Sequence, residues 1–219
     1  MIHYINIHTH KPIATPNNLE VINIVFGQEF TPDNSSIYSL GVHPWYLNNK
    51  INFDKFMRLS KHLSIVAIGE CGLDYQKENL HKFSKTLQKE IFLKQIKIAE
   101  ELQKPIIIHC VKCFDELIKL KKRCITTIPW IIHGFSKNKQ VAQQLIDQGF
   151  YLSFGSLIFT SSKNQEALKI IPLEKLFLET DEQIKYNIFD IYLQATKIRD
   201  TFLDSLQKQI QENYERVFN

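Results

Sequence analysis

The chain has 219 residues, of which 44% are hydrophobic, and it carries a formal net charge of +4 at pH 7. This composition supports one hydrophobic core, and no apolar run reaches the about 18 residues that a membrane-spanning helix requires. The positive charge is too small and too dispersed to indicate a polyanionic partner by itself. We therefore expect a single domain over residues 1–219 with no membrane association, and the lack of a signal-peptide pattern predicts a cytoplasmic location.

Eight short apolar runs predict eight β-strands, and segments of helical periodicity separate most of them. The predicted strands lie at residues 5–10, 21–26, 37–42, 65–69, 105–108, 130–132, 151–154 and 176–178. The predicted helices lie at residues 51–62, 84–103, 112–123, 188–199 and 202–216, and one more helix ends at Asp147 before Gly149. Strands that alternate with helices in this way indicate an α/β fold, a (β/α)8 barrel of the TIM-barrel type.

The first two connections between strands are unusually short. Ten residues separate His10 from Val21, and ten separate Phe26 from Ile37. A parallel crossover normally takes about a dozen residues or more, so we expect no outer helices at residues 11–20 and 27–36. Strand faces left bare there would need cover from a C-terminal helix or from a second subunit, so a homo-oligomer is one expectation.

Residues that can bind metals stand at the ends of six predicted strands. His8 and His10 are spaced i, i+2, which places both imidazoles on one face of a strand. The full set is His8, His10, His43, Glu70, His109, His133 and Asp181. The active site of a (β/α)8 barrel lies at these ends, and a mixed nitrogen and oxygen set suits divalent metal ions. Two ions would fit if Glu70 bridges them, and Asp181 could bind one ion and deprotonate a water.

Six motifs, in this order, resemble the TatD-type family of metal-dependent deoxyribonucleases, within the amidohydrolase-like superfamily. They read His8-Thr9-His10, Gly41-Val42-His43-Pro44, Ile68-Gly69-Glu70-Cys71-Gly72-Leu73-Asp74, Pro105 to His109, Ile132-His133-Gly134-Phe135-Ser136 and Leu178-Glu179-Thr180-Asp181. Each motif is weak alone, but the six in order are specific. The resemblance runs from residue 5 to about residue 181 and marks the chain as a short member.

The resemblance implies two divalent metal ions (Zn, Mn or Mg) and a hydrolytic reaction. One ion would be held by His8, His10, Glu70 and Asp181, and the other by Glu70, His109 and His133. His43 would lie outside the ligand shell, near the scissile phosphate, so the catalytic residues would be Asp181, Glu70 and His43. The implied substrate is DNA, cleaved at phosphodiester bonds from a 3′ end or in single strands.

Four positions depart from the family pattern. Asn6 replaces an aspartate, Val111 an arginine, Lys137 a glycine and Gln183 a proline. Loss of the arginine removes a bidentate phosphate contact, which the neighbouring Lys112 could replace only as a point charge. Two alternatives to a nuclease therefore stay open. One is a related hydrolase of a small ester, amide or lactone, and the other is a barrel that binds metal or nucleic acid without turnover.

Other polar and aromatic residues have structural interpretations. Asp74 and Tyr75 are expected to hold the loop after Glu70 rather than to react. Cys110 and Cys113 form a C-x-x-C motif, but no second pair has matching spacing, so we expect packed thiols. The histidines expected on the surface or on helices are His3, His62 and His81. The aromatic residues that could stack on a base or be buried at the barrel rim are Trp45, Tyr46 and Phe135.

Overall fold

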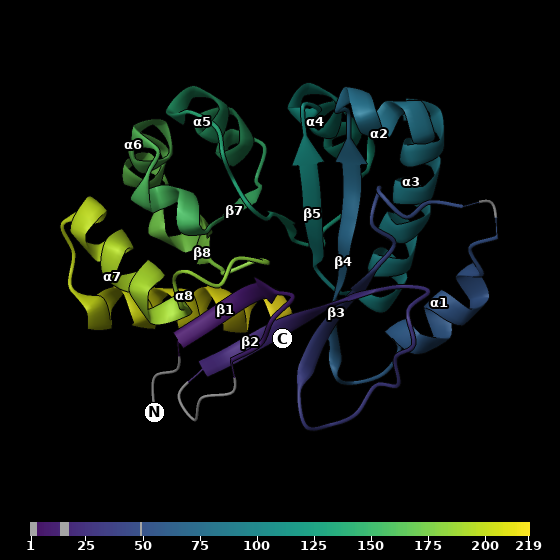
Figure 1. Ribbon diagram of the computed structural model, residues 1–219, viewed down its shortest axis with the longest axis horizontal. Helices are drawn as coiled ribbons and strands as arrows, with labels where there is room; N and C mark the ends of the chain where they lie inside the picture. Colours follow the sequence, from purple (N-terminus) through teal and green to yellow (C-terminus); the bar gives the residue numbers. More distant parts are fainter. Residues whose placement is uncertain (1–3, 14–17, 49) are drawn as a thin grey trace. The chain divides into compact units, whose positions relative to one another are not determined.

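The computed structural model describes residues 4–13, 18–48 and 50–219. The chain divides into two compact units. Figure 1 shows the ribbon, coloured along the sequence from the N-terminus to the C-terminus. The first unit comprises Met1–Ile22 and Ile132–Asn219, and the second comprises Asn23–Ile131. The expectation that residues 1–219 form one domain stays a prediction, and each unit is described by itself.

Three strands belong wholly to the first unit: β1 (Tyr4–Thr9), β7 (Tyr151–Phe154) and β8 (Leu176–Leu178). β1 pairs in parallel with the beginning of β2 (Asn18–Val25), and β7 pairs in parallel with β8. A parallel bridge between Thr9 and Asp181 also joins the end of β1 to the segment after β8. This bridge brings two distant predicted site segments together.

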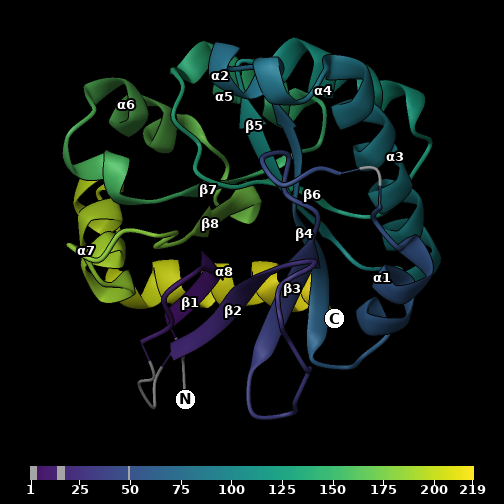
Figure 2. The ribbon, with the colours of Figure 1, turned by 45° about the vertical axis from the view of Figure 1, so that its right-hand side comes forward.

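Helices surround these strands in the first unit. They are α5 (Lys139–Asp147), η1 (Ser156–Phe159), α6 (Ser162–Ile170), η2 (Leu173–Lys175), α7 (Ile188–Arg199) and α8 (Leu203–Phe218). Both α7 and α8 pack against β1, and Figure 2 shows α8 crossing next to it. The Tyr192 hydroxyl of α7 fixes this packing, because it bonds to the backbone amide and carbonyl of Ile5, both at 3.2 Å. A C-terminal helix therefore covers β1, which is one of the two kinds of cover that we expected for the bare strand faces.

The second unit contains β3 (Ile37–Gly41), β4 (Ile65–Asp74) and β5 (Ile106–Val111), which pair in parallel. Its helices are α1 (Phe53–Ser60), α2 (Lys77–Lys82), α3 (Lys85–Leu102) and α4 (Phe114–Arg123), and β6 spans Trp130–Ile132. Helix α3 lies along β4, as Figure 1 shows. The fully buried rings of Phe92 and Trp130 meet at 5.9 Å in this core.

Several boundaries differ from the predicted ones for identifiable reasons. Strand β4 continues to Asp74, because residues 72–74 pair with residues 109–111 of β5. Glu70 and His109 consequently lie inside their strands rather than after them. Helices α2 and α6 were not predicted. The first has only six residues, and the second buries only Asn164, Ala167 and Leu168, so neither shows a clear apolar period. Gly149 follows α5 with a φ of 78°, as a C′ glycine should.

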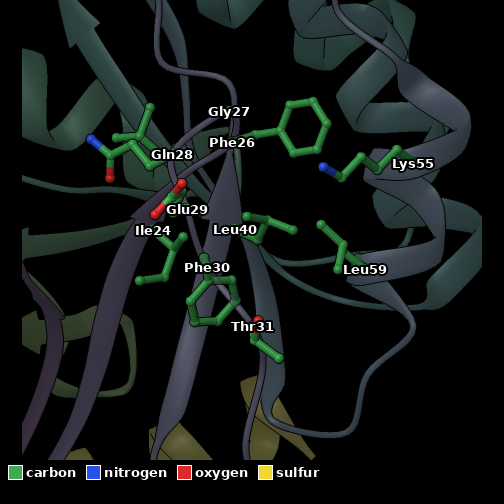
Figure 3. Close-up of a pocket in the computed structure, with 11 residues that line it drawn as sticks. Ile24, Phe26, Gly27, Gln28, Glu29, Phe30, Thr31, Leu40, Lys55 and Leu59 are labelled. Atoms are coloured by element: carbon green, nitrogen blue, oxygen red, sulfur yellow. The ribbon is translucent and has the colours of Figure 1, made fainter.

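The two short connections contain no helix in their described parts, residues 11–13 and 27–36, as expected. In the second unit a loop takes the place of the missing helix, and Phe30 packs edge-on against Tyr38 with the ring centroids 4.9 Å apart. Figure 3 shows the pocket of about 460 Å³ that remains there, lined by Phe26, Phe30 and Leu59 and by the exposed Glu29 and Lys55 among others. A second subunit over this face stays a prediction.

Among the described helices, none is both long and apolar enough to cross a membrane.

Candidate metal sites

The first cluster of potential metal ligands lies in the first unit and consists of His8, His10 and Asp181. His8 lies in β1 and His10 follows that strand directly. The Nε2 atoms of His8 and His10 lie 3.6 and 3.7 Å from Oδ1 of Asp181, so both rings face one side, as the spacing predicts. The His8 side chain is fully buried, whereas 43% of the Asp181 side chain is exposed. Solvent can therefore reach the carboxylate of this cluster.

Backbone pairing holds this first cluster in place. The amide of Asp181 donates to the carbonyl of His8 at 3.0 Å, and the amide of His10 donates to the carbonyl of Asp181 at 3.2 Å. Asp181 adopts a left-handed conformation with a φ of 55°, which aspartate and asparagine tolerate better than most residues. The carboxylate position is thus set by the backbone as well as by its side chain.

His133 and Glu179 form a second group beside Asp181 in the same unit. Nδ1 of His133 lies 3.4 Å from Oε1 of Glu179, and the amide of Gly134 donates to that oxygen at 2.6 Å. The rings of His8 and His133 lie 4.3 Å apart. The potential ligand atoms of His133, Glu179 and Asp181 all lie within 4.8 Å of one another.

Glu179 was not among the predicted ligands. It stands two residues before Asp181, the same spacing that singled out His8 and His10, so the sequence held a signal for it. Its Oε2 atom is buried and has no hydrogen-bond partner among the described residues. A buried carboxylate oxygen is costly without a partner, and a cation is a suitable partner. The donor set of the first unit therefore fits a divalent metal ion.

The second unit holds a cluster of His43, Glu70 and His109, from the segment after β3, from β4 and from β5. Oε1 of Glu70 lies 3.0 Å from Nε2 of His43 and 2.7 Å from Nδ1 of His109. The two imidazole nitrogens lie 3.3 Å apart. All three side chains are largely buried, with exposed fractions of 7%, 4% and 12%. His43, predicted as an outer residue, therefore touches the same carboxylate oxygen as His109.

The backbone at Glu70 is anchored by a residue that sequence reasoning missed. The Glu70 amide donates to Oδ1 of Asn23 at 2.7 Å, and the Ser39 hydroxyl donates to the same oxygen at 3.1 Å. The signal was a buried asparagine within the β-branched run of residues 21–26. Gly41 contributes as well, because a Cβ atom there would collide with the Glu70 carbonyl. The glycine of the G-x-H motif thus permits a close approach of β3 to β4.

Asp74 supports His109 from behind. Its Oδ2 lies 3.2 Å from Nε2 of His109 and accepts the indole N–H of Trp45 at 2.6 Å, while Oδ1 accepts the Gln76 amide at 2.8 Å. Burial acts to raise the pKa of Asp74, but the hydrogen bonds from His109, Trp45 and Gln76 outweigh burial and lower that pKa. Asp74 therefore stays ionised and orients His109, which is the supporting role expected for it.

Phe135, His62 and His81 lie where their structural interpretations place them, whereas Trp45 and Tyr46 are not buried. Phe135 is 1% exposed and packs against Phe154. His62 lies in the turn after α1, where its Nδ1 is 2.7 Å from the Ser64 hydroxyl, and His81 is exposed on α2. His3 lies outside the described residues. Trp45 and Tyr46 are 49% and 57% exposed.

Two of the unusual residues have structural roles in the first unit. The buried Asn6 donates to the Thr180 hydroxyl at 2.9 Å and to Oε1 of Glu20 at 3.3 Å, and its own oxygen accepts the Thr180 amide at 3.1 Å. Gln183 closes its own loop by donating to the Tyr186 carbonyl at 2.6 Å. Each unit thus holds a ligand cluster of its own, and the expectation that Glu70 serves both ions stays a prediction.

Sequence comparisons relate the chain to a family of hydrolases. A family model described as TatD related DNase matches residues 28–219. YcfH of Escherichia coli K12, named an uncharacterized metal-dependent hydrolase, is 34% identical over 148 residues, which cover 66% of this chain and 55% of YcfH. An uncharacterized metal-dependent hydrolase of Buchnera aphidicola is 27% identical over 231 residues, which cover 96% of this chain and 84% of that protein. The 3′-5′ ssDNA/RNA exonuclease TatD of Citrobacter koseri is 32% identical over 151 residues, covering 64% and 55%.

The region matched to YcfH and to TatD of Citrobacter koseri thus spans about half of each relative. Among solved structures, YjjV, a TatD homologue of Escherichia coli, aligns with a TM-score of 0.83 and 22% identity, covering 100% of this chain and 99% of that one. A TatD family hydrolase from Entamoeba histolytica aligns with a TM-score of 0.73 and 22% identity, covering 84% and 74%. This likeness, with eight strands that alternate with helices, confirms the predicted α/β barrel class.

Proposed function

This chain belongs to the TatD related DNase family, and on that premise we propose that it hydrolyses phosphodiester bonds of DNA with divalent metal ions. The observation that carries the proposal is the pair of histidine and carboxylate clusters, one in each unit. The relatives named as metal-dependent hydrolases and as a 3′-5′ ssDNA/RNA exonuclease support the reaction class and the substrate class.

In the first unit, His8, His10 and Asp181 would hold one divalent ion, and in the second unit Glu70 and His109 would hold another. Zn, Mn and Mg are the candidates, with the imidazole-rich donor sets favouring Zn or Mn over Mg. Such ions, when bound, supply Lewis acidity that neutralises phosphate charge and makes water more acidic. The number of ions is part of this proposal, with His133 and Glu179 available as further ligands.

Asp181 would accept the proton of the attacking water. Its side chain is 43% exposed, while the neighbouring Glu179 is fully buried, so Asp181 is the carboxylate that water and substrate can reach. The Nε2 atoms of His8 and His10 lie 3.6 and 3.7 Å from its Oδ1, so the carboxylate lies beside two potential metal ligands. We therefore assign proton transfer to the Asp181 carboxylate.

His43 would orient Glu70 and face the substrate. Its Nδ1 accepts the backbone N–H of Trp45 at 3.1 Å, which places the imidazole proton on Nε2. From Nε2 the proton is donated to Oε1 of Glu70 at 3.0 Å. A second proton on the ring would cost the Trp45 bond, so we expect His43 to act as a neutral donor.

Exposed aromatic rings beside His43 support single-stranded nucleic acid as the substrate. The ring centroids of Trp45 and Tyr46 lie 5.2 and 5.7 Å from that of His43. Both rings are about half exposed, and stacking on a base contributes roughly 1–3 kcal/mol when the base is unpaired. A 3′ end or a single strand offers such bases, whereas a closed duplex does not.

A small ester, amide or lactone is the second candidate substrate. One observation favours it, because Val111 stands where the family pattern has an arginine that could hold a phosphate. We also propose a cytoplasmic location, since none of the four cysteines forms a disulfide. A homo-oligomer covering the pocket beside Phe30 belongs to the same set of proposals.

The deciding experiment combines elemental analysis of the purified protein with digestion of single-stranded DNA labelled at either end. We expect bound divalent metal, cleavage that stops when the metal is chelated, and mononucleotides released from the 3′ end first. Duplex DNA with blunt ends and single-stranded RNA serve as comparison substrates. Metal-dependent turnover of a p-nitrophenyl ester without DNA cleavage would favour the second candidate, and metal binding with no turnover of either would refute both.

A further inference from the structure

Two cysteine thiols of the second unit face each other outside the candidate metal cluster. The Sγ atoms of Cys110, near the end of β5, and Cys113, the N-cap of α4, lie 3.2 Å apart. Lys112, between them, has a φ of 57°, a left-handed conformation that is uncommon for a lysine. The turn between β5 and α4 therefore brings the two sulfur atoms together, and only a small further approach separates them from bonding distance.

The two thiols differ in their access to solvent. Cys110 is partly exposed, whereas Cys113 is 4% exposed and directs its Sγ to the Leu73 carbonyl at 3.1 Å. An accessible sulfur next to a buried one is the arrangement in which the first is attacked from outside and the second resolves the product. The other two cysteines differ from this pair: Cys71 is fully buried, and Cys124 lies at the opposite end of α4.

We propose that Cys110 and Cys113 form a reversible disulfide by exchange with a small disulfide of the glutathione class. The Cys110 sulfur attacks the small disulfide, whose S–S bond breaks, and a mixed disulfide forms as one small thiol leaves. The Cys113 sulfur then attacks Cys110, and the second small thiol leaves. The protein loses two electrons and two protons, and the small disulfide gains both to become two thiols.

The position of the pair links it to the metal cluster of the same unit. Cys110 directly follows His109 in β5, and in the sheet Cys110 pairs with Leu73 while Val111 pairs with Asp74. The disulfide would tie the turn after β5 to the start of α4, beside the strand pair that carries His109 and Asp74. The pair is thus a modification site next to, but separate from, the residues that would bind metal.

The test uses the full-length protein, freed of metal by a chelator and equilibrated with mixtures of reduced and oxidised glutathione. The thiols are then trapped by alkylation and the protein is examined by intact and peptide mass spectrometry. We expect the oxidised wild type to be lighter by two hydrogen atoms, with Cys110 and Cys113 protected from alkylation, and dithiothreitol to restore both thiols. Because the readout is mass, it does not depend on any enzymatic activity.

Variants separate the proposal from other thiol chemistry. Cys113→Ser should retain glutathione on Cys110, because the resolving sulfur is missing, and Cys124→Ser should behave as the wild type. The proposal is overturned if Cys110 and Cys113 both remain alkylatable in excess oxidised glutathione. It is also overturned if wild-type Cys110 holds glutathione as stably as Cys113→Ser does.

Discussion

Oδ2 of Asp74 lies 3.2 Å from Nε2 of His109, on the side of the imidazole ring away from Glu70. The carboxylate therefore favours the tautomer with its proton on Nε2, which leaves the Nδ1 lone pair facing the ligand cluster. Asp74 orients a candidate metal ligand without belonging to the cluster itself.

The first prediction follows from this contact. Asp74→Asn should weaken metal binding in the second unit by about 10–100-fold, because the His109 ring loses its ionised partner. Isothermal titration with Zn²⁺ or Mn²⁺ measures the change. Asp54→Asn, an exposed aspartate on α1, removes the same charge and should leave the affinity unchanged. Equal affinities for wild type and Asp74→Asn would contradict the orienting role.

The second prediction concerns Asp181. Asp181→Asn should lower the hydrolysis rate by about 10²–10⁴-fold or more, because the proton acceptor is lost. Asparagine tolerates the φ of 55°, so the backbone should not change. Rates on single-stranded DNA and binding of an uncleavable phosphorothioate strand are the measurements. Glu182→Gln, on the exposed neighbouring residue, is the control, and a variant that loses binding in proportion to rate would argue against a base.

The third prediction concerns Asn6. Asn6→Ala should reduce the free energy of unfolding by about 1–3 kcal/mol, since the buried Thr180 amide loses its acceptor and the Thr180 hydroxyl loses the Asn6 donor. Urea denaturation provides the measurement, with Asn34→Ala on an exposed loop as the control. An equal loss of stability in both variants would show that the buried contacts contribute little.

The fourth prediction concerns how the stability of an Asn6→Asp variant depends on pH. Burial raises the pKa of Glu20, although the hydrogen bonds from Asn6 and Ile13 oppose this. Asn6→Asp would replace the donor with a second carboxylate, so its stability relative to the wild type should fall as pH rises and both groups ionise. Urea denaturation across mildly acidic to neutral pH tests this. A stability difference that stays constant with pH would contradict the repulsion.

The fifth prediction concerns Lys104, whose amino group donates to the carbonyls of Ser60 and His62 at 2.5 and 3.3 Å. Burial lowers the pKa of Lys104 from 10.5 to about 8. Between these values the unfolded chain holds a proton that the folded chain has released, so this group makes the wild type more stable as pH rises. Lys104→Met has no such titrating group. The free energy of unfolding of the wild type, minus that of the variant, should therefore increase from pH 8 to 10.5. A flat difference would show that Lys104 is not perturbed.

The sequence by itself determined the alternation of strands and helices, the helix-poor connections and most of the candidate ligands. Apolar periodicity is a local property, and the i, i+2 spacing of His8 and His10 places two imidazoles on one face in any strand. The family resemblance rested on short motifs of the same local kind.

Only the tertiary structure decided which side chains meet. Pairing of residues 72–74 with β5 extended β4 and placed Asp74 behind His109, and the bridge from Thr9 to Asp181 set the first cluster. Such contacts also identified the roles proposed for Asn23, for Glu179 and for the facing thiols of Cys110 and Cys113. Contacts between residues far apart in the chain depend on strand register and backbone conformation, and a local pattern specifies neither.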